Sequence, residues 1–277
     1  MTPRWEGDPF QERDEEPAGK GWPAAKQKQK LPGGLARAYE DAYALVSRFY
    51  HVPKPALEIV KDKGFEKYNV DHKDAYAVAV QEEGKIVVAT DVEEGLREYD
   101  CILGSEDLME LTMLKLLVHE LLHFSPGNWH EDWKDEAQLI ANESVTELVA
   151  GLLTCKGMKW NEKPASIPQV VFANLLYRPT IVYVVAAIIV AEDGPKASER
   201  ARWLLNKPPD AVVDFLAQGV EKIAGVSKGK GETFLAGRMS DSKIRKTIFR
   251  ASKKYTHHPP VYIFSLPLTA GGENNAR

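Results

Sequence analysis

The stretch LTMLKLLVHELLHF, residues 111–124, is the strongest helical signal in the chain. It predicts a helix over residues 105–124, in which Ser105 caps the start and the two acidic residues after it suit the positive end of the helix dipole. The run Ser125-Pro126-Gly127 ends this helix. Apolar residues surround its histidines, which indicates a buried and dry helix face.

Within this helix, residues 119–123 read His-Glu-Leu-Leu-His. His119 and His123 are four positions apart, so their side chains lie on one face, one turn apart. Two imidazole nitrogens placed in this way can each reach about 2.0–2.1 Å from one Zn²⁺. Glu120 lies about 100° around the helix, where its carboxylate can take a proton from a metal-bound water. We predict a zinc site with His119 and His123 as ligands and Glu120 as the general base.

A catalytic zinc has three protein ligands and one open position, so a third ligand is expected. A second predicted helix, from about Lys134 to Cys155, contains Asn142-Glu143-Ser144-Val145-Thr146-Glu147. Glu143 follows His123 by 20 residues, and Glu147 lies one turn further along on the same face.

With these residues the sequence resembles the thermolysin-like gluzincins, whose pattern is HExxH followed about 20 residues later by Asn-Glu-x-x-x-Asp. The resemblance implies that Glu143 is the third zinc ligand and that Glu147 accepts the free N–H of a ligand histidine, His119. Glu147 stands where the family has an aspartate, and the resemblance covers only residues 119–147. A solvated helix face with i,i+4 spacing is the alternative explanation for the two glutamates.

His130, seven residues after His123, is the competing third ligand. The metzincin pattern HExxHxxGxxH is missed by one residue, because glycine and histidine stand at 127 and 130 instead of 126 and 129. The segment HEDWK, residues 130–134, also resembles SprT-like proteases, which follow HExxH with a histidine and a nearby tryptophan. That resemblance implies a DNA-associated protease with a histidine as the third ligand.

The gluzincin resemblance also implies hydrogen-bond donors near the developing oxyanion, contributed by the distal part of the chain. Tyr255, His257 and His258 are the candidates, and a loop cluster stabilised by the two following prolines is the alternative. In zincins an edge strand beside the active helix pairs with extended substrate. The candidates are the predicted hairpin strands 75–80 and 85–90, and the sequence leaves open which one is the edge.

The composition excludes several classes of protein. With 277 residues, 44% hydrophobic and 27% charged, the chain has the balance of a globular protein. A net charge of −4 argues against a polyanion binder as a whole. Cys101 and Cys155 are too few for a disulfide framework and lack the CxxC spacing of a thiolate zinc site, which indicates a reducing compartment.

The sequence shows no pattern typical of export or of membrane insertion. Residues 1–21 lack the apolar core of a secretory signal. The most apolar run, residues 180–191, spans about 18 Å as a helix, which is too short for a bilayer core of roughly 30 Å. We therefore expect a cytoplasmic protein that does not contact the membrane.

Residues 228–254 form a basic segment, with nine Lys or Arg against Glu232 and Asp241. This segment contains Phe234 and Phe249, so nucleic acid is one possible partner. A solvated helix docked against the acidic N-terminal half is the alternative that we favour.

The order of predicted elements favours an α+β fold, because a few strands are followed by many helices. We expect a disordered tail over residues 1–33, a minimal zincin-like core over 34–156 and a helical C-terminal subdomain over 157–277. The core would combine a small sheet with the HExxH helix and the glutamate helix. The remaining patterns predict a strand over 57–60, irregular chain from His257 onward, and helices over 35–50, 168–177, 180–191, 196–205 and 211–223.

The function predicted from the sequence is that of a zinc-dependent metallopeptidase acting on a peptide or protein substrate. Two alternatives stay open. One is a zinc-binding scaffold or regulator without proteolytic activity, and the other is the SprT-like, DNA-associated protease.

Overall fold

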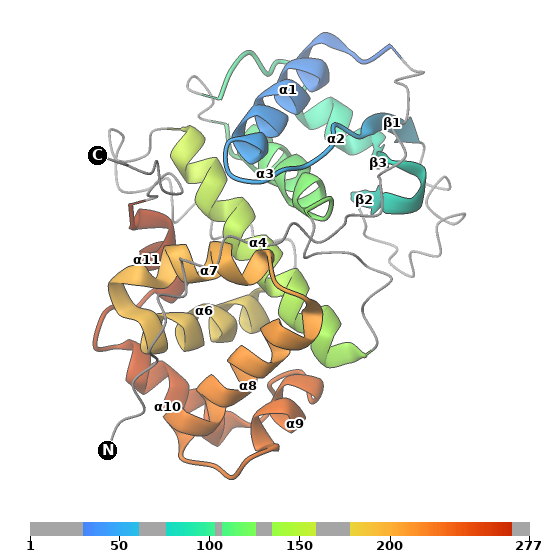
Figure 1. The fold of residues 1–277 in the computed structure, drawn as a ribbon. Coiled ribbons are helices and arrows are strands. Elements are labelled where there is room, and N and C mark those ends of the chain that lie inside the picture. Colours follow the sequence, from blue (N-terminus) through green and yellow to red (C-terminus); the bar gives the residue numbers. More distant parts are fainter. Residues whose placement is uncertain (1–29, 61–75, 103–106, 126–134, 159–177, 268–277) are drawn as a thin grey trace, which may run out of the picture.

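The computed structural model describes residues 30–60, 76–102, 107–125, 135–158 and 178–267 (Figure 1). The described chain is α+β, with many helices and one small mixed sheet, as the sequence predicts. In chain order the elements are α1 (Gly33–Ser47), β1 (Ala56–Val60), β2 (Ala77–Val80), η2 (Gln81–Glu83), β3 (Lys85–Ala89), α2 (Thr90–Gly95), α3 (Leu108–Leu122), α4 (Glu136–Gly157), α6 (Pro179–Asp193), η5 (Gly194–Lys196), α7 (Ala197–Leu205), α8 (Pro209–Ala224), α9 (Lys230–Ala236), α10 (Ser242–Ser252) and α11 (Pro259–Ser265).

The sheet has the strand order β1-β3-β2. The predicted hairpin is confirmed, because β2 and β3 pair antiparallel through a turn in which Gly84 adopts a left-handed conformation with φ of 61°. The predicted strand near residue 57 is also confirmed, and β1 pairs parallel with β3. β3 is therefore central, and β2 is the hairpin strand at the edge; β2 packs against α3.

The helix that carries the histidines begins later than predicted. α3 starts at Leu108, and Asp107 is its N-cap, with a carboxylate that accepts the backbone N–H groups of Met109 and Glu110. Asp107 has extended backbone angles, so the helix begins after it. Its predicted cap Ser105 lies outside the described residues.

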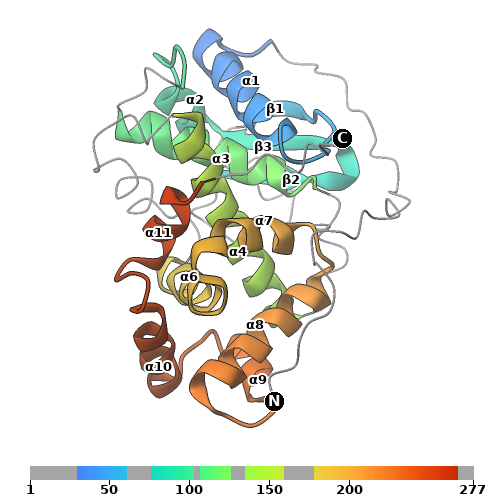
Figure 2. The same cartoon turned by 60° about the vertical axis from the view of Figure 1, so that its left-hand side comes forward.

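Two groups of elements lie on either side of α4 (Figures 1 and 2). The sheet and helices α1, α2 and α3 form one group, and α6 to α11 form the other. α4 contacts α1 and α3 on one side and α6, α7, α8, α9 and α11 on the other. Most of α4 is buried in consequence, and it is the element that both groups share.

α6 is buried along most of its length, which confirms a core helix in the apolar run 180–191. Among the described helices, none combines the length and the apolarity that crossing a bilayer requires.

The prediction of irregular chain from His257 onward is wrong for residues 259–265, which form α11. Two prolines stand in its first turn, where a missing N–H costs nothing. Phe264 is fully buried and its ring packs against Gly151 of α4, where an added Cβ would come within 2.5 Å of it.

The basic segment forms α9 and α10. Both pack on α8, α10 also packs on α6, and α9 also contacts α4, whose Glu136 pairs with Arg238 of the segment. These contacts lie mainly in the C-terminal group, whereas we favoured docking against the acidic N-terminal half.

The predicted tail over residues 1–33 falls almost wholly outside the described residues, as does the predicted helix 168–177. The predicted domain boundary at residue 156 falls in the last turn of α4.

α1 depends on a close approach of its first turn to the chain after α2. A Cβ on Gly34 would lie 1.9 Å from the carbonyl oxygen of Leu96. We expect Gly34→Ala to lower the free energy of unfolding by about 1–3 kcal/mol, the usual cost of overpacking. Gly33→Ala is the control, because among the described residues a Cβ there meets only the Arg37 side chain, at 3.5 Å. Equal denaturant midpoints for the two variants would contradict this packing.

Candidate metal centre

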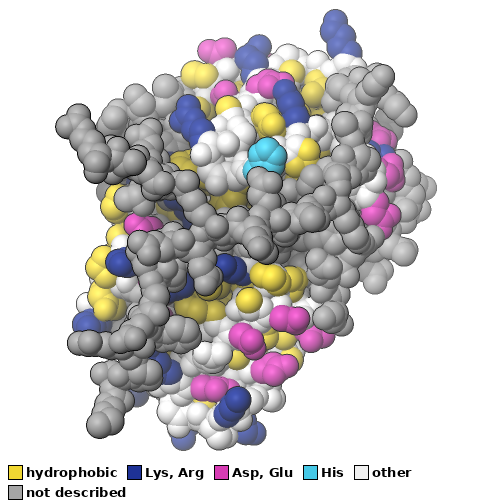
Figure 3. Space-filling model, viewed as in Figure 1, with side chains coloured by type: hydrophobic (Ala, Val, Ile, Leu, Met, Phe, Trp, Pro, Cys, Tyr) yellow, Lys and Arg dark blue, Asp and Glu magenta, His cyan; other side chains and the backbone are white. Residues whose placement is uncertain are grey.

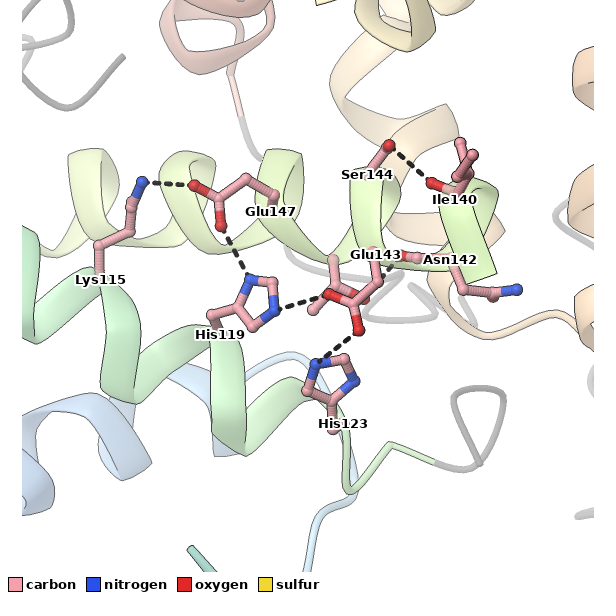
Figure 4. Close-up of polar contacts among 9 residues, drawn as sticks. Lys115, His119, His123, Ile140, Asn142, Glu143, Ser144 and Glu147 are labelled. Carbon is pink, nitrogen blue, oxygen red and sulfur yellow. Dashed lines mark hydrogen bonds and ion pairs between the residues drawn. The ribbon is translucent and has the colours of Figure 1, made fainter. Parts of the chain in front are cut away.

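Helices α3 and α4 bring the predicted ligands together (Figure 4). Lys115 pairs with Glu147, and His123 with Glu143, so residue numbers rise along α3 as they fall along α4. The two helices are therefore antiparallel, and the two turns of α3 from Lys115 to His123 face the one turn of α4 from Glu143 to Glu147. Side chains spaced by four residues lie above one another on a helix face. The two histidines of α3 and the two glutamates of α4 therefore meet along a single line.

His119, His123 and Glu143 form a compact cluster, which we call the His–Glu cluster. One donor atom from each side chain lies within 4.8 Å of the other two. Nε2 of His119 is 3.2 Å from Oε2 of Glu143, and Nε2 of His123 is 3.6 Å from Oε1 of the same carboxylate. The two imidazole rings have centroids 4.8 Å apart and lie edge to face. These are the only described residues that gather as a candidate metal site.

Glu147 holds His119 from the side opposite to Glu143. Its Oε2 is 2.8 Å from Nδ1 of His119, and its Oε1 accepts a hydrogen bond from Nζ of Lys115. Lys115 and Glu147 form a buried ion pair, with side chains 1% and 0% exposed. Because Nδ1 of His119 is engaged by Glu147, Nε2 is the nitrogen that points into the His–Glu cluster.

The cluster attracts positive charge. Burial alone would lower the pKa of His119, but hydrogen bonds to Glu143 and Glu147 and their negative charges raise it to about 10. Burial would raise the pKa of Glu147, but the Lys115 charge and the contact with His119 lower it to about 2. Glu147 is therefore a carboxylate that accepts the Nδ1–H of His119.

Glu120 lies beside the cluster and is buried. Burial raises the pKa of its carboxyl, the charge of His119 lowers it, and that of Glu143 raises it again, with a result of about 7. A hydrogen bond from the backbone of Ala79, on edge strand β2, also favours the ionised form. Glu120 thus changes its charge near neutral pH, as a proton-transfer group needs to do.

A second contact ties α3 to the sheet. The side chain of Gln81, buried at the end of β2, donates from Nε2 to the carbonyl oxygen of His123. His123 is the C-cap of α3, so this bond satisfies a carbonyl that no longer has a helical partner. It fixes the end of the helix that carries the second histidine.

Of the remaining predicted site residues, those that the structure describes lie apart from the His–Glu cluster. Tyr255 packs its ring near Tyr262, at a centroid distance of 6.5 Å, and against Gly194. The carbonyl oxygen of His257 accepts a hydrogen bond from the Tyr183 hydroxyl, and His258 precedes the first turn of α11. Their role as oxyanion donors stays a prediction. His130 lies outside the described residues.

Two polar residues of the site were not predicted. Lys115 is a single lysine in the apolar run of α3, four residues before His119, and this spacing places it on the ligand face. A charged residue at such a position indicates a buried partner, so the signal was present in the sequence. Gln81 had no such signal, because its contact with His123 depends on how the hairpin packs on α3.

Comparisons of the chain with family models, with curated proteins and with solved structures gave no match. The arguments that follow rest on the geometry and chemistry of the site.

Lys115 offers a test of the buried network. Lys115→Met leaves Glu147 buried without the ammonium group that faces it, and we expect a loss of about 3–5 kcal/mol in the free energy of unfolding. Chemical denaturation of the metal-free protein measures this loss.

Lys222→Met is the matched control, because Lys222 pairs with Glu192 at 2.7 Å while its side chain is 74% exposed. An exposed pair of this kind contributes about 1 kcal/mol or less. If both variants lost the same stability, the Lys115–Glu147 pair would have no special place in the core.

Proposed function

We propose that the protein is a zinc-dependent metallopeptidase with a zincin-like core. The observation that carries this proposal is the His–Glu cluster: two imidazoles one helical turn apart and a carboxylate from the next helix have donor atoms within 4.8 Å of one another. Glu120, the adjacent buried carboxyl, is not among these donors.

The spacing of the donors suits zinc. Four donors placed tetrahedrally at about 2.0–2.1 Å from one zinc ion lie about 3.3 Å from one another. Nε2 of His119 lies 3.2 Å from Oε2 of Glu143 and Nε2 of His123 lies 3.6 Å from Oε1, both close to this value. One donor atom from each of the three residues lies within 4.8 Å of the other two, so the side chains would draw together around an ion. Two imidazole nitrogens and one carboxylate oxygen are also a ligand set that catalytic zinc sites use, with the fourth position open.

The charges of the site suit a divalent cation. Glu120, Glu143 and Glu147 carry three negative charges when ionised, and Lys115 carries one positive charge, which leaves −2 with neutral histidines. A buried charge without a compensating partner costs free energy, so a net charge of −2 in the site favours the binding of a divalent cation. In its absence a proton on His119 supplies part of the missing charge, in keeping with the raised pKa of that imidazole.

Each residue has a separate part in the proposed hydrolysis of a peptide bond. A zinc ion in this site would supply a Lewis acid that polarises the scissile carbonyl. His119, His123 and Glu143 would hold it, and Glu147 would fix the tautomer of His119. Glu120 takes a proton from the attacking water and delivers it to the leaving amine.

The position of β2 supports a peptide as the substrate. β2 is an edge strand, it packs on α3, and its residue Ala79 contacts Glu120. An extended peptide added along this edge would pass close to the carboxyl that moves the proton.

Metal binding is the first test. Metal-free protein titrated with Zn²⁺ in a calorimeter is expected to bind one equivalent, and zinc at 1,000 times Kd should add about 4 kcal/mol to stability. Loss of a residue that only hydrogen-bonds to a metal ligand weakens metal binding about 10–100-fold. His123→Ala removes a ligand itself, so it should weaken zinc binding by at least this much. His51→Ala removes an exposed histidine and should change nothing. Zinc binding unchanged in His123→Ala would remove the site.

Glu120→Gln tests the chemistry separately from the metal. It should retain one zinc and lose about 10²–10⁴-fold in kcat on a quenched-fluorescence peptide library, because the proton acceptor is gone. Glu110→Gln, on the same helix but outside the cluster, is the control.

Full activity of Glu120→Gln would exclude Glu120 as the base. A zinc-loaded wild type that cleaves no peptide would favour the scaffold alternative instead.

A further inference from the structure

A hollow of about 680 Å³ is bordered by residues of α6, of α10 and of the chain leading into α11. We call it the α10 hollow. None of its described lining residues lies on α3 or α4, so it is separate from the His–Glu cluster. The metallopeptidase proposal does not use it.

One side of the α10 hollow is cationic. Lys246, Arg250 and Lys253 line it and are exposed. They follow one another at i, i+4 and i+7, so they lie on one face over about 10 Å of helix. No Asp or Glu is among the described residues that line the hollow.

Carboxylates close in the chain to this region are already engaged. Asp193, at the end of α6, pairs with Arg200, and Glu192 pairs with Lys222. Within the described part of the chain, no ion pair involves the three cations of the α10 hollow. In the lower right of Figure 3, several Asp and Glu side chains lie over the region of α8, and Lys and Arg side chains lie below them and to their left. The hollow therefore carries about three uncompensated positive charges.

The other side of the hollow is aromatic. The rings of Tyr183 and Phe249 meet edge to face, with centroids 5.3 Å apart and an angle of 89°. Both are half-buried, and the Tyr183 hydroxyl is fixed by a 2.6 Å hydrogen bond to the carbonyl oxygen of His257. An immobilised aromatic pair offers a surface on which a planar group can stack at low entropic cost.

The size and the charge together select a class of ligand. Small-molecule sites have volumes of about 300–1,000 Å³, and the α10 hollow falls within this range. A carboxylate carries one negative charge, whereas a phosphate group carries nearly two and offers three acceptor oxygens. Three cations along one helix face suit two or more linked phosphates better than a single carboxylate. A side chain such as Arg250 can bind a phosphate through two parallel hydrogen bonds.

We propose that the α10 hollow binds a phosphorylated small molecule with a planar body, of the nucleoside diphosphate or triphosphate class. The phosphates contact Lys246, Arg250 and Lys253, and the planar group packs on Tyr183 and Phe249. A single-stranded nucleic acid offers similar chemistry, but it needs a track along which several successive nucleotides can bind, and the α10 hollow is a single open depression.

The test measures the binding of ADP with a fluorescent methylanthraniloyl group to the full-length protein by anisotropy. We expect saturable 1:1 binding, displaced by unlabelled ADP and by inorganic pyrophosphate but not by adenosine. Lys246→Ala/Arg250→Ala should weaken binding about 10- to 100-fold, since two charge-assisted contacts are lost.

Lys228→Ala/Lys243→Ala is the matched control. It removes two exposed charges from the same basic segment, outside the hollow, and should change the affinity less than twofold. Circular dichroism of both variants establishes that they are folded.

Four results would overturn the proposal. One is equal weakening in the two double variants, which would indicate a diffuse charge effect. Another is displacement by adenosine as effective as by ADP. A third is loss of binding in His123→Ala with retention in Lys246→Ala/Arg250→Ala, which would place the nucleotide at the candidate metal centre. The last is an affinity for oligothymidylate that exceeds that for ADP and rises from 4 to 12 nucleotides, which would indicate a strand-binding surface.

Discussion

The structure depends on five ionisable side chains along the contact between α3 and α4, of which four are buried and Glu143 is partly buried. Lys115, His119 and His123 on one helix face Glu143 and Glu147 on the other, in antiparallel order and at one-turn intervals. An ionised group in an apolar interior is tolerated only where another group compensates it. The charge and position of each of these residues therefore depend on the residue that it faces on the other helix. The packing around α4, which contacts both groups of elements, maintains the dry surroundings that make this mutual dependence strong.

This arrangement is a weak source of stability and a strong source of specificity. The attraction within a buried ion pair is largely offset by desolvation, and apolar residues of similar volume often replace such pairs without loss. An apolar helix pair would leave the register of α3 on α4 free to shift by a turn. The Lys115–Glu147 pair and the Glu147–His119 bond admit one register, in which both histidine Nε2 atoms meet Glu143. The main effect of the Lys115–Glu147 pair is thus to position the donor atoms, and its contribution to the stability of the fold is small.

Local signals predicted what local interactions determine. The 3.6-residue period of apolar residues predicted helices α3 and α4. The i,i+4 spacing of His119 and His123 predicted that both side chains lie on one helix face. The contact of Glu147 with His119 came only with the gluzincin resemblance. Long-range packing decided the rest: β1 joins β3 in parallel across a chain separation that no local pattern encodes, and Gln81 reaches His123 because the hairpin packs on α3. α11 escaped prediction because Pro259 and Pro260 suggest irregular chain, whereas at the start of a helix they are favourable and Phe264 is buried against α4.

Glu120 is the residue for which a purely structural account is weakest. In the proposed site His119, His123 and Glu143 would be enough to hold a cation, and a site built only to stabilise the fold would gain from an apolar residue at position 120. A buried carboxyl with a pKa of about 7 instead adds a desolvation cost without adding a ligand. Its hydrogen bond from Ala79 connects it to the edge strand where an extended peptide can add. A proton acceptor beside the proposed ligands and such an edge would have a use in hydrolysis and none in a closed structural site.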